Sequence, residues 1–600
     1  METLRERSEI DARFQWDLTG LFASDAAWEE ALAGLDAKVQ AAAAFEGKLN
    51  DAENIRAYMD AAMALERLVD NLFTYASLRR SEDTRAEAAQ RMYARIYGKY
   101  VAAMTATAFA TPEILSLPEE KLQAIAADPL LKDYEVQMRE LLRKKPHTLS
   151  MPEEKLLASF GEALSAPGQI SENLMDADMT FASVKDGEGK DVEVTKSNFI
   201  LLQNSNDRVL RENAFRSFYA GYKGHINTFA ATYAGNVKAA VAEAAARHYN
   251  SSREMSMSED NIPERVYDQL IESVHRHMPT MHRYAELRKR ILGLDELHYY
   301  DLYAPLTQGV DKRFTYEEAQ KMVLAAVAPL GEQYQAVAKS GFEDRWIDVY
   351  PNKGKTGGAF SSGSYDSNPF IMTNFTGTLD SVSTIAHEMG HSMHSWFSKN
   401  TQAFQNANYT LFVAEVASTV NENLMIEQLL KDCTDPRERL FLLNEYLEGF
   451  KGTVYRQTMF AEFEKKAHAL AERGEALDPA TLNAVYRELI EQYFGPALVI
   501  DDEVQYEWSR IPHFYRPFYV YVYATGYSTA VALSEGILRD GAPAVKKYLE
   551  FLSLGGSQYP LDELRHAGVD LTTPAPVETA LEKFAAVLAD AERTAAQLGL

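Results

Sequence analysis

Residues 379–394 read LDSVSTIAHEMGHSMH, a stretch in which histidines recur at helical spacing. His387 and His391 are four residues apart, so on a helix both imidazoles project from one face and can bind one cation. Glu388 follows the first histidine and can reach a water molecule beside that cation without being a ligand. This arrangement is typical of a zinc hydrolase, in which the metal lowers the pKa of bound water to about 7 and a carboxylate removes its proton.

The alternative interpretation of this stretch is a helix with solvated histidines on a polar face. The apolar residues around the histidines are Ile385, Ala386, Met389, Met393, Trp396 and Phe397. They predict a mostly buried helix, in which bare histidines would need polar partners. The metal site is therefore favoured.

An open catalytic zinc site usually has three protein ligands and a water molecule. The metzincin pattern would place glycine and histidine at positions that hold His394 and Phe397, so that class is excluded. Glu415 lies 24 residues after His391, on a predicted helix over 411–422. Its neighbours on that helix are Leu411, Phe412, Val416 and Thr419. We expect a buried carboxylate that requires a cation, with a buried Arg or Lys partner as the alternative.

Two further residues are expected near the metal. Glu422 lies two turns after Glu415 and is predicted to accept a hydrogen bond from a ligand imidazole, which fixes the orientation of that ring. A solvated glutamate is the alternative. His394 follows His391 by three residues, and we expect a structural or supporting role for it rather than direct ligation.

Length and composition describe a large folded protein. The chain has 600 residues and a mass of 67.3 kDa, with 46% hydrophobic and 25% charged residues, so it can bury a large core. Its 61 basic and 87 acidic residues give a net charge of −26, which makes nucleic acid and anionic membranes poor partners. The only cysteine is Cys433, and no apolar run is long enough to cross a membrane. These features predict a cytoplasmic protein.

Hydrophobic periodicity predicts a mainly α fold with a small β-sheet directly before the metal helix. Helical spacing is found over 21–165, over 205–292 and after 378. A strand, turn and strand are predicted over 179–194, and a second extended zone over 345–374. We expect a helical N-terminal region over 1–200 that ends in this β-hairpin, followed by a catalytic region over 201–600.

A glycine-rich loop joins the two extended pieces of the second zone. A phosphate-binding loop around Lys355 is excluded, because Val349 stands where that motif needs its first glycine. Gly357 and Gly358 suit a place where another backbone approaches closely, such as a substrate strand added to a sheet edge. A flexible hairpin loop is the alternative.

Residues 511–527 read IPHFYRPFYVYVYATGY, with five tyrosines after His513. Buried phenols need hydrogen-bond partners, so this number exceeds what packing requires. Hydroxyl and imidazole donors beside a zinc ion can stabilise the oxyanion that forms when water attacks an amide, by about 3–4 kcal/mol per donor. Packing in the core is the alternative for most of them.

Together, residues 387–394, residues 412–418 and the tyrosine segment resemble the thimet oligopeptidase-like zinc peptidases. The length, the helical N-terminal part and the Gly357-Gly358 loop are most similar to the oligoendopeptidase F branch. The resemblance extends over nearly the whole chain from Leu21. It implies a two-lobed, zincin-type helical body with a deep channel that admits short unfolded peptides.

The resemblance also implies roles for individual residues. One Zn²⁺ per chain is bound by His387, His391 and Glu415, and Glu388 is the general base. The residues implied to stabilise the transition state are His513, Tyr519 and Tyr523, with Tyr515 and Tyr521 as alternatives for the tyrosines.

The expected activity is zinc-dependent cleavage of internal bonds in oligopeptides. An exopeptidase, either a carboxypeptidase or a peptidyl-dipeptidase, and an inactive peptide-binding scaffold are the alternatives. The sequence does not indicate an oligomeric state.

Overall fold

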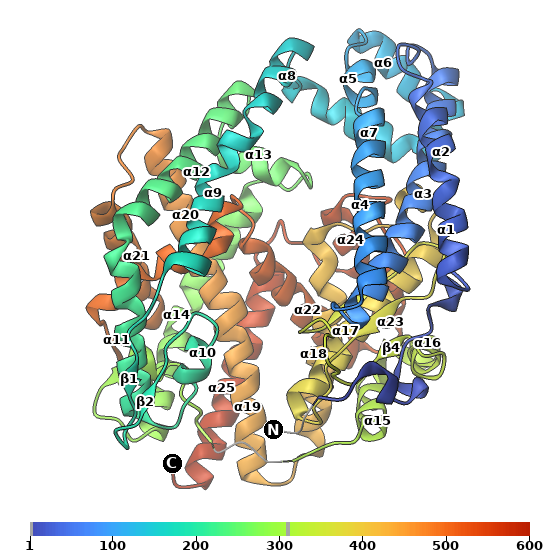
Figure 1. Ribbon diagram of the computed structural model, residues 1–600. Coiled ribbons are helices and arrows are strands. Elements are labelled where there is room, and N and C mark those ends of the chain that lie inside the picture. The colour runs from blue at the N-terminus through green and yellow to red at the C-terminus, as the bar shows by residue number, and fades with distance from the viewer. Residues whose placement is uncertain (1–3, 308–311) are drawn as a thin grey trace. The chain divides into compact units, whose positions relative to one another are not determined.

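A computed structural model describes residues 4–307 and 312–600 and divides them into two compact units (Figure 1). Unit 1 consists of residues 1–151, 312–428 and 533–568, and unit 2 consists of residues 152–311, 429–532 and 569–600. Helices account for 71% of the structure, which confirms the predicted mainly α class. The predicted division near residue 200 remains a prediction.

Unit 1 contains the first seven helices and the segment around the histidines. Its helices are α1 (Asp25–Ala33), α2 (Leu35–Ala43), α3 (Ala52–Glu82), α4 (Glu87–Thr107), α5 (Ala110–Leu115), α6 (Glu119–Ala126), α7 (Glu135–Lys144), α15 (Tyr316–Ala326), α16 (Gly331–Glu343), α17 (Leu379–Thr401), α23 (Ala542–Leu552) and α24 (Pro560–Ala567). Two more helices belong to both units, α18 (Leu411–Asp432) and α22 (Tyr521–Asp540).

The three-stranded sheet of unit 1 is formed by β4 (Ile347–Asp348), β5 (Phe360–Ser362) and β6 (Phe370–Met372) in the order β4-β6-β5. Strand β6 pairs parallel with β4 and antiparallel with β5. Strand β5 is therefore at an edge of the sheet. The short sheet predicted before the metal helix is confirmed.

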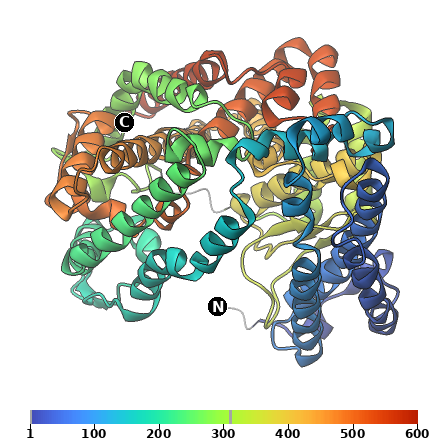
Figure 2. The ribbon, with the colours of Figure 1, turned by 90° about the horizontal axis from the view of Figure 1, so that it is seen from above.

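The N-terminal helices and the sheet share one hydrophobic core. Trp28 and Leu72 are completely buried where α1 meets α3, and the same cluster includes Phe370 and Met372 of β6. Figure 2 shows the yellow segment that carries the sheet beside the blue N-terminal helices of this unit. Helix α3 begins at an N-cap, Asp51, whose side chain accepts from Asn54 N. The burial of these apolar side chains stabilises the sheet against the N-terminal helices, and α17 packs on β5 and β6 of that sheet.

Unit 2 is helical apart from two short pairs of strands. Its helices are α8 (Met151–Ser159), which starts at the boundary, α9 (Gly161–Asn173), α10 (Phe199–Gln203), α11 (Arg208–Gly224), α12 (Ile226–Ala246), α13 (Ser252–Ser258), α14 (Arg265–Ile291), α19 (Pro436–Phe450), α20 (Arg456–Glu472), α21 (Pro479–Phe494) and α25 (Ala575–Gln597). The predicted hairpin consists of β1 (Val184–Lys185) and β2 (Asp191–Val192), shorter than the sequence suggested. Strands β3 (Leu297–His298) and β7 (Leu498–Val499) pair in parallel.

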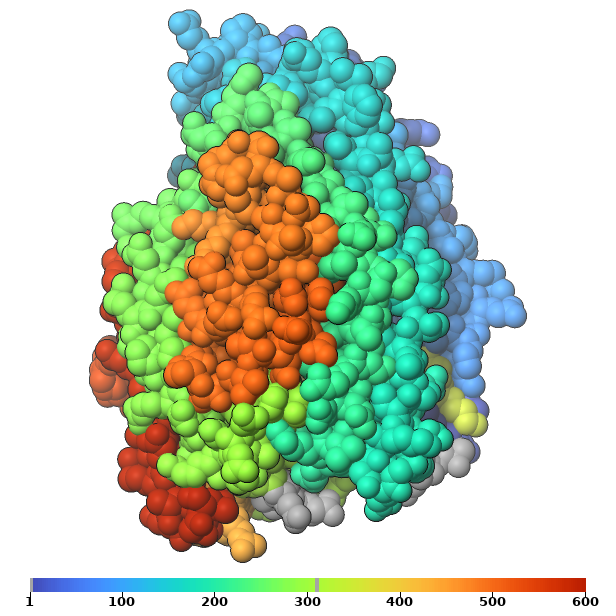
Figure 3. Space-filling view, turned by 90° about the vertical axis from the view of Figure 1, so that its left-hand side faces the viewer, coloured from blue at the N-terminus to red at the C-terminus, as the bar shows by residue number. Residues whose placement is uncertain are grey.

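An aromatic and ionic core supports the segment that carries His513. On the face shown in Figure 3, orange residues around α21 are flanked by green residues from the 200–300 range, and α21 packs on both α12 and α14. The 3₁₀ helix η11 (Asp502–Arg510) carries Glu507, which is completely buried between Arg456 and Arg510 at 2.6 and 2.9 Å. The hydroxyls of Tyr219, Tyr299 and Tyr486 also donate to this carboxylate. Because the ion pairs and hydrogen bonds outweigh burial, the pKa of Glu507 is lowered.

None of the helices within residues 4–307 and 312–600 combines the length and the apolar character that crossing a bilayer requires.

Candidate metal centre and active site

Helix α17 presents both histidines because of how it begins and what it buries. Thr378 is its N-cap and accepts from Ser381 N at 3.2 Å, and Asp380 complements the helix dipole in the first turn. The apolar face buries Val382, Ile385, Ala386, Met389, Met393 and Phe397. The face that carries His387 and His391 is only partly buried, so both imidazoles remain available to a ligand.

Helix α18 crosses α17 at Gly390. A Cβ atom at this position would lie 2.5 Å from Ser418 Cα and 2.6 Å from Ala417 O, so only glycine permits this approach. Asn421 Nδ2 donates to Ala386 O at 3.0 Å and ties the two helices together. The close crossing brings Glu415 to the histidines.

The three predicted ligands converge. Glu415 Oε2 lies 3.5 Å from His387 Nε2 and 3.4 Å from His391 Nε2. Ligand atoms of the three residues all lie within 4.8 Å of one another. Tetrahedral zinc with bonds of about 2.0–2.1 Å places its ligand atoms about 3.4 Å apart, so the donor types and spacing fit this ion. Glu415 is only partly buried, with 44% of its side chain exposed, whereas the sequence suggested a buried carboxylate. Its carboxylate lies beside His387 and His391, whose side chains are themselves 26% and 19% exposed.

The electrostatics of the cluster favour a cation. A hydrogen bond from His391 and the charges of both histidines lower the pKa of Glu415 to about 2. Burial opposes the protonation of His387, but Glu422 and the other carboxylates raise its pKa to about 9. Three carboxylates thus face two imidazoles, and a bound cation would balance the excess negative charge.

Glu388 is next to the first histidine and is 7% exposed. Burial raises the pKa of its carboxyl group above the ordinary value. A raised pKa strengthens a carboxylate as a proton acceptor, which is what a general base near neutral pH needs.

The two residues expected around the ligands differ in their surroundings. Glu422 Oε1 lies 3.1 Å from His387 Nδ1, the contact that the predicted orienting role requires. His394 is 1% exposed, and its ring stacks on Tyr409 with centroids 3.7 Å apart. Burial lowers the pKa of His394 to about 3, so the ring is neutral, and it is not in the cluster of possible ligands.

Strand β5 lies against α17, since Ser361 Oγ is 2.8 Å from Ser392 Oγ. Ile371 N donates to Trp346 O, so the polar backbone groups of Ile371 face β4. Ser361 is the direct partner of Ile371, and in an antiparallel pair its own N–H and C=O must then face away from β6. This outer edge has no partner strand among the strands that the structure describes.

Gly357 and Gly358 lie just before β5 and are both exposed. Gly358 has a φ of +77°, and Asn374 Nδ2 donates to its carbonyl oxygen at 2.8 Å. A Cβ atom at either position would meet nothing within 4 Å. The space beside both residues is thus open, and the approach of another backbone there stays a prediction.

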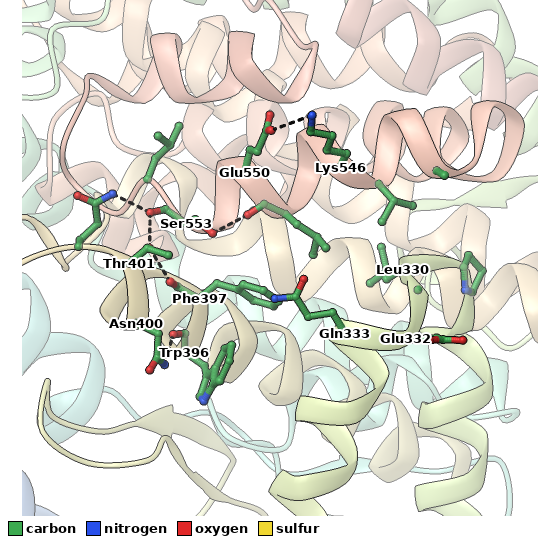
Figure 4. Close-up of a pocket in the computed structure, with 17 residues that line it drawn as sticks. Leu330, Glu332, Gln333, Trp396, Phe397, Asn400, Thr401, Lys546, Glu550 and Ser553 are labelled. Carbon is green, nitrogen blue, oxygen red and sulfur yellow. Dashed lines mark hydrogen bonds and ion pairs between the residues drawn. The ribbon is translucent and has the colours of Figure 1, made fainter.

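A polar cavity of about 280 Å³ begins where β5 ends. Ser362, Ser364, Ser395 and Lys399 contribute polar groups to its wall, and burial lowers the pKa of Lys399 to about 8. A larger, mostly apolar cavity of about 970 Å³ lies at the last turn of α17, between Trp396, Asn400 and α23 (Figure 4). The larger cavity includes no residue of the metal cluster, so it is separate from the chemistry described above.

The histidine and tyrosines of the second motif lie in unit 2. Tyr523 OH is 3.4 Å from His513 Nε2, and the Tyr519 ring packs on Tyr523 with centroids 5.4 Å apart. Burial lowers the pKa of His513. By contrast, Tyr515 OH is 2.7 Å from Thr232 Oγ1, and Tyr521 is buried. The geometry therefore groups His513 with Tyr519 and Tyr523, while their part in the reaction stays a prediction.

Comparison with known proteins agrees with this geometry. The profile of peptidase family M3 matches residues 201–583, and a profile described as oligopeptidase F matches residues 113–181. The chain belongs to peptidase family M3. Oligopeptidase PepF of Bacillus subtilis strain 168 is 45% identical over 586 residues, which cover 97% of this chain and 87% of that protein.

Solved structures place this M3 peptidase in the same branch. A structure from Chlamydophila abortus has a TM-score of 0.92 at 34% identity and covers 98% of this chain and 100% of that one. Oligoendopeptidase F from Enterococcus faecium has a TM-score of 0.74 at 35% identity, with 96% and 99% covered. The protein is a metalloendopeptidase of the oligoendopeptidase F type that acts on oligopeptides, as the sequence predicted.

Several residues of the M3 peptidase were not identified from the sequence. Gly390 lies inside the histidine motif. Its lack of a side chain is the only feature in the sequence that indicates the close crossing of α17 and α18. Tyr409 stacks on His394 but belongs to a loop without periodicity. Asn421 pairs with a backbone carbonyl of α17 and looks like an ordinary polar helix residue in the sequence.

Proposed function

We propose that this endopeptidase binds one Zn²⁺ per chain through His387, His391 and Glu415. The observation that carries the proposal is the spacing of 3.4 and 3.5 Å between Glu415 Oε2 and the two Nε2 atoms. A zinc ion held there supplies Lewis acidity to a peptide carbonyl and to a water molecule. Glu422 supports the site by fixing the His387 ring through Nδ1.

Glu388 is the proposed general base. Its carboxylate takes a proton from the attacking water and then gives that proton to the leaving amine, so that one group serves both halves of the hydrolysis. Its place directly after His387 and the raised pKa of its carboxyl group support this role.

The peptide substrate is proposed to bind as an extended strand along β5. The outward N–H and C=O of Ser361 offer the backbone hydrogen bonds of strand addition, and Gly357 and Gly358 leave room for the incoming chain. Backbone recognition of this kind accepts many sequences, but it requires an unfolded segment. The substrates are therefore short, unstructured oligopeptides.

His513, Tyr519 and Tyr523 are proposed to stabilise the oxyanion of the transition state. Support comes from the resemblance to the family and from the grouping of these three side chains in unit 2. An imidazole or phenol donor of this kind contributes about 10²–10³ to kcat.

We also propose that the protein works in the cytoplasm. Its lone cysteine, Cys433, suits a reducing compartment, and the net charge of −26 makes nucleic acid an unsuitable partner.

Removal and return of the metal tests the proposed function. A chelator should abolish cleavage of a quenched-fluorescent peptide that is blocked at both ends, and one equivalent of Zn²⁺ should restore it. In the matched variant His391→Ala, the added zinc should not restore activity. Full turnover by a sample that contains no measurable metal would overturn the proposal.

A further inference from the structure

Phe518 has an unusual backbone conformation directly before Tyr519. Its φ is +54°, and the side chain is 3% exposed. A bulky residue rarely adopts a left-handed conformation, and such strain persists only where the surroundings hold it in place. Strained residues of this kind collect at functional sites, so the contacts that hold Phe518 are informative.

Glu464 of α20 holds the strained residue. Phe518 N donates to Glu464 Oε1 at 2.7 Å, and Glu464 is 0% exposed. A second contact fixes the preceding residue, because Ser256 Oγ donates to Pro517 O at 2.7 Å. Two hydrogen bonds from separate helices thus hold the C=O and the N–H of one peptide group, the one that joins Pro517 to Phe518.

His468 lies one turn after Glu464 on α20 and completes this environment. Its ring centroid is 4.5 Å from that of Phe518, and its Nδ1 is 2.8 Å from Ser252 Oγ. Neither Glu464 Oε2 nor His468 Nε2 has a hydrogen-bond partner among the residues that the structure describes. Burial raises the pKa of Glu464 well above its usual value.

A buried carboxyl group without an ion-pair partner is unfavourable for folding. An apolar side chain of equal length would fill the same volume without this penalty. What such a side chain lacks is an acceptor for the Phe518 N–H. We therefore interpret Glu464 as the hydrogen-bond acceptor for the backbone at Phe518 rather than as a side chain that fills the core.

We propose that Glu464 is a positioning residue of the peptidase, which fixes the turn at Phe518 and so sets the orientation of Tyr519 towards Tyr523 and His513. The inference rests on the proposed function, in which these three side chains stabilise the transition state. If the turn relaxed, Tyr519 would move first, because it is the next residue in the chain. A misplacement of about 1 Å in such a group can lower the rate by about 10².

Two substitutions of nearly equal size test the role. Glu464→Met removes the acceptor, and we expect kcat to fall at least about tenfold while KM and the metal content stay close to those of the wild type. Glu464→Gln keeps a neutral acceptor at Oε1, and we expect kcat within about threefold of the wild type. A role in packing alone would not separate the two variants.

The proposal is overturned if Glu464→Met keeps the wild-type kcat, or if both variants lose activity equally. Should Glu464→Met fail to fold, Ser256→Ala decides the question. This substitution removes the hydrogen bond to the Pro517 carbonyl, and because Ser256 is only partly buried, it leaves the core intact. We expect its kcat to fall at least about threefold at constant KM, and an unchanged kcat would overturn the proposal.

Tyr523→Phe, measured in parallel, separates this inference from the proposed function. If Tyr523→Phe loses activity and Glu464→Met does not, only the positioning role is wrong. If Tyr523→Phe and His513→Ala both keep the wild-type kcat, the proposed role of the whole segment fails.

Discussion

Gly390 shows how one residue governs the geometry of the metal cluster. The backbone of α18 occupies the space that a side chain at position 390 would need, with Ser418 Cα only 2.5 Å from the position of a Cβ atom. Backbone cannot move aside as a flexible side chain can. Any larger residue must therefore separate the two helices that carry the ligands.

We expect Gly390→Ala to destabilise the fold and to weaken metal binding. Alanine gains up to about 1 kcal/mol in helix propensity, but overpacking typically costs about 1–3 kcal/mol and displaces Glu415. The metal content should fall below that of the wild type, and kcat/KM should fall at least about tenfold. Gly536→Ala in α22 is the matched control, because a Cβ atom at position 536 would meet nothing within 4 Å. Equal metal content and activity in all three proteins would contradict the argument.

At the scale of elements, β5 is the strand that connects the sheet to substrate binding. Its middle residue, Ser361, pairs with Ile371 but directs its backbone N–H and C=O away from β6. Proline lacks the N–H and is tolerated at such an edge position without loss of the β5–β6 pairing.

Ser361→Pro should therefore weaken peptide binding without unfolding the sheet. Loss of one backbone hydrogen bond of about 1 kcal/mol, together with the bulk of the ring, should raise KM about tenfold with a smaller change in kcat. Ser361→Ala keeps the N–H and removes only the hydroxyl contact to Ser392, so it should stay within about twofold of the wild type. Steady-state kinetics on one peptide compare the two variants, and the same KM in both would argue against strand addition.

The metal ligands could be predicted from the sequence, whereas the turn at Phe518 could not. The spacing of His387 and His391 and the place of Glu415 follow from helical periodicity, because all three lie on two regular helices. The strain at Phe518 has no local signal, since phenylalanine is not a residue that favours a positive φ. Its partner Glu464 is 54 residues away in the sequence, and only packing brings the two together.

At the scale of the whole molecule, buried His468 links stability to pH. Burial lowers its pKa from 6.5 to about 3 in the folded protein. The unfolded chain therefore binds a proton below about pH 6.5 while the folded chain does not, so this group lowers stability as the pH falls. Glu464 acts in the opposite direction, because its raised pKa lowers stability as the pH rises above 4.5.

Replacement of His468 should reveal its share of this balance. Between pH 6.5 and pH 5, the stability of His468→Gln relative to the wild type should increase by up to about 2 kcal/mol, at 1.36 kcal/mol per pH unit. The midpoints of urea unfolding at the two pH values measure this difference. A difference between variant and wild type that does not change with pH would show that His468 binds protons equally in the folded and unfolded protein.

The central claim is that Glu388 acts as a base beside a metal bound by His387, His391 and Glu415. The most direct test is the turnover of a doubly blocked, quenched-fluorescent peptide by Glu388→Gln, with the metal content of the same sample measured. We predict wild-type metal content and a kcat lower by about 10²–10⁴, while Asp380→Asn, in the exposed first turn of the same helix, keeps the wild-type kcat. Full turnover by the metal-loaded Glu388→Gln protein would contradict the account.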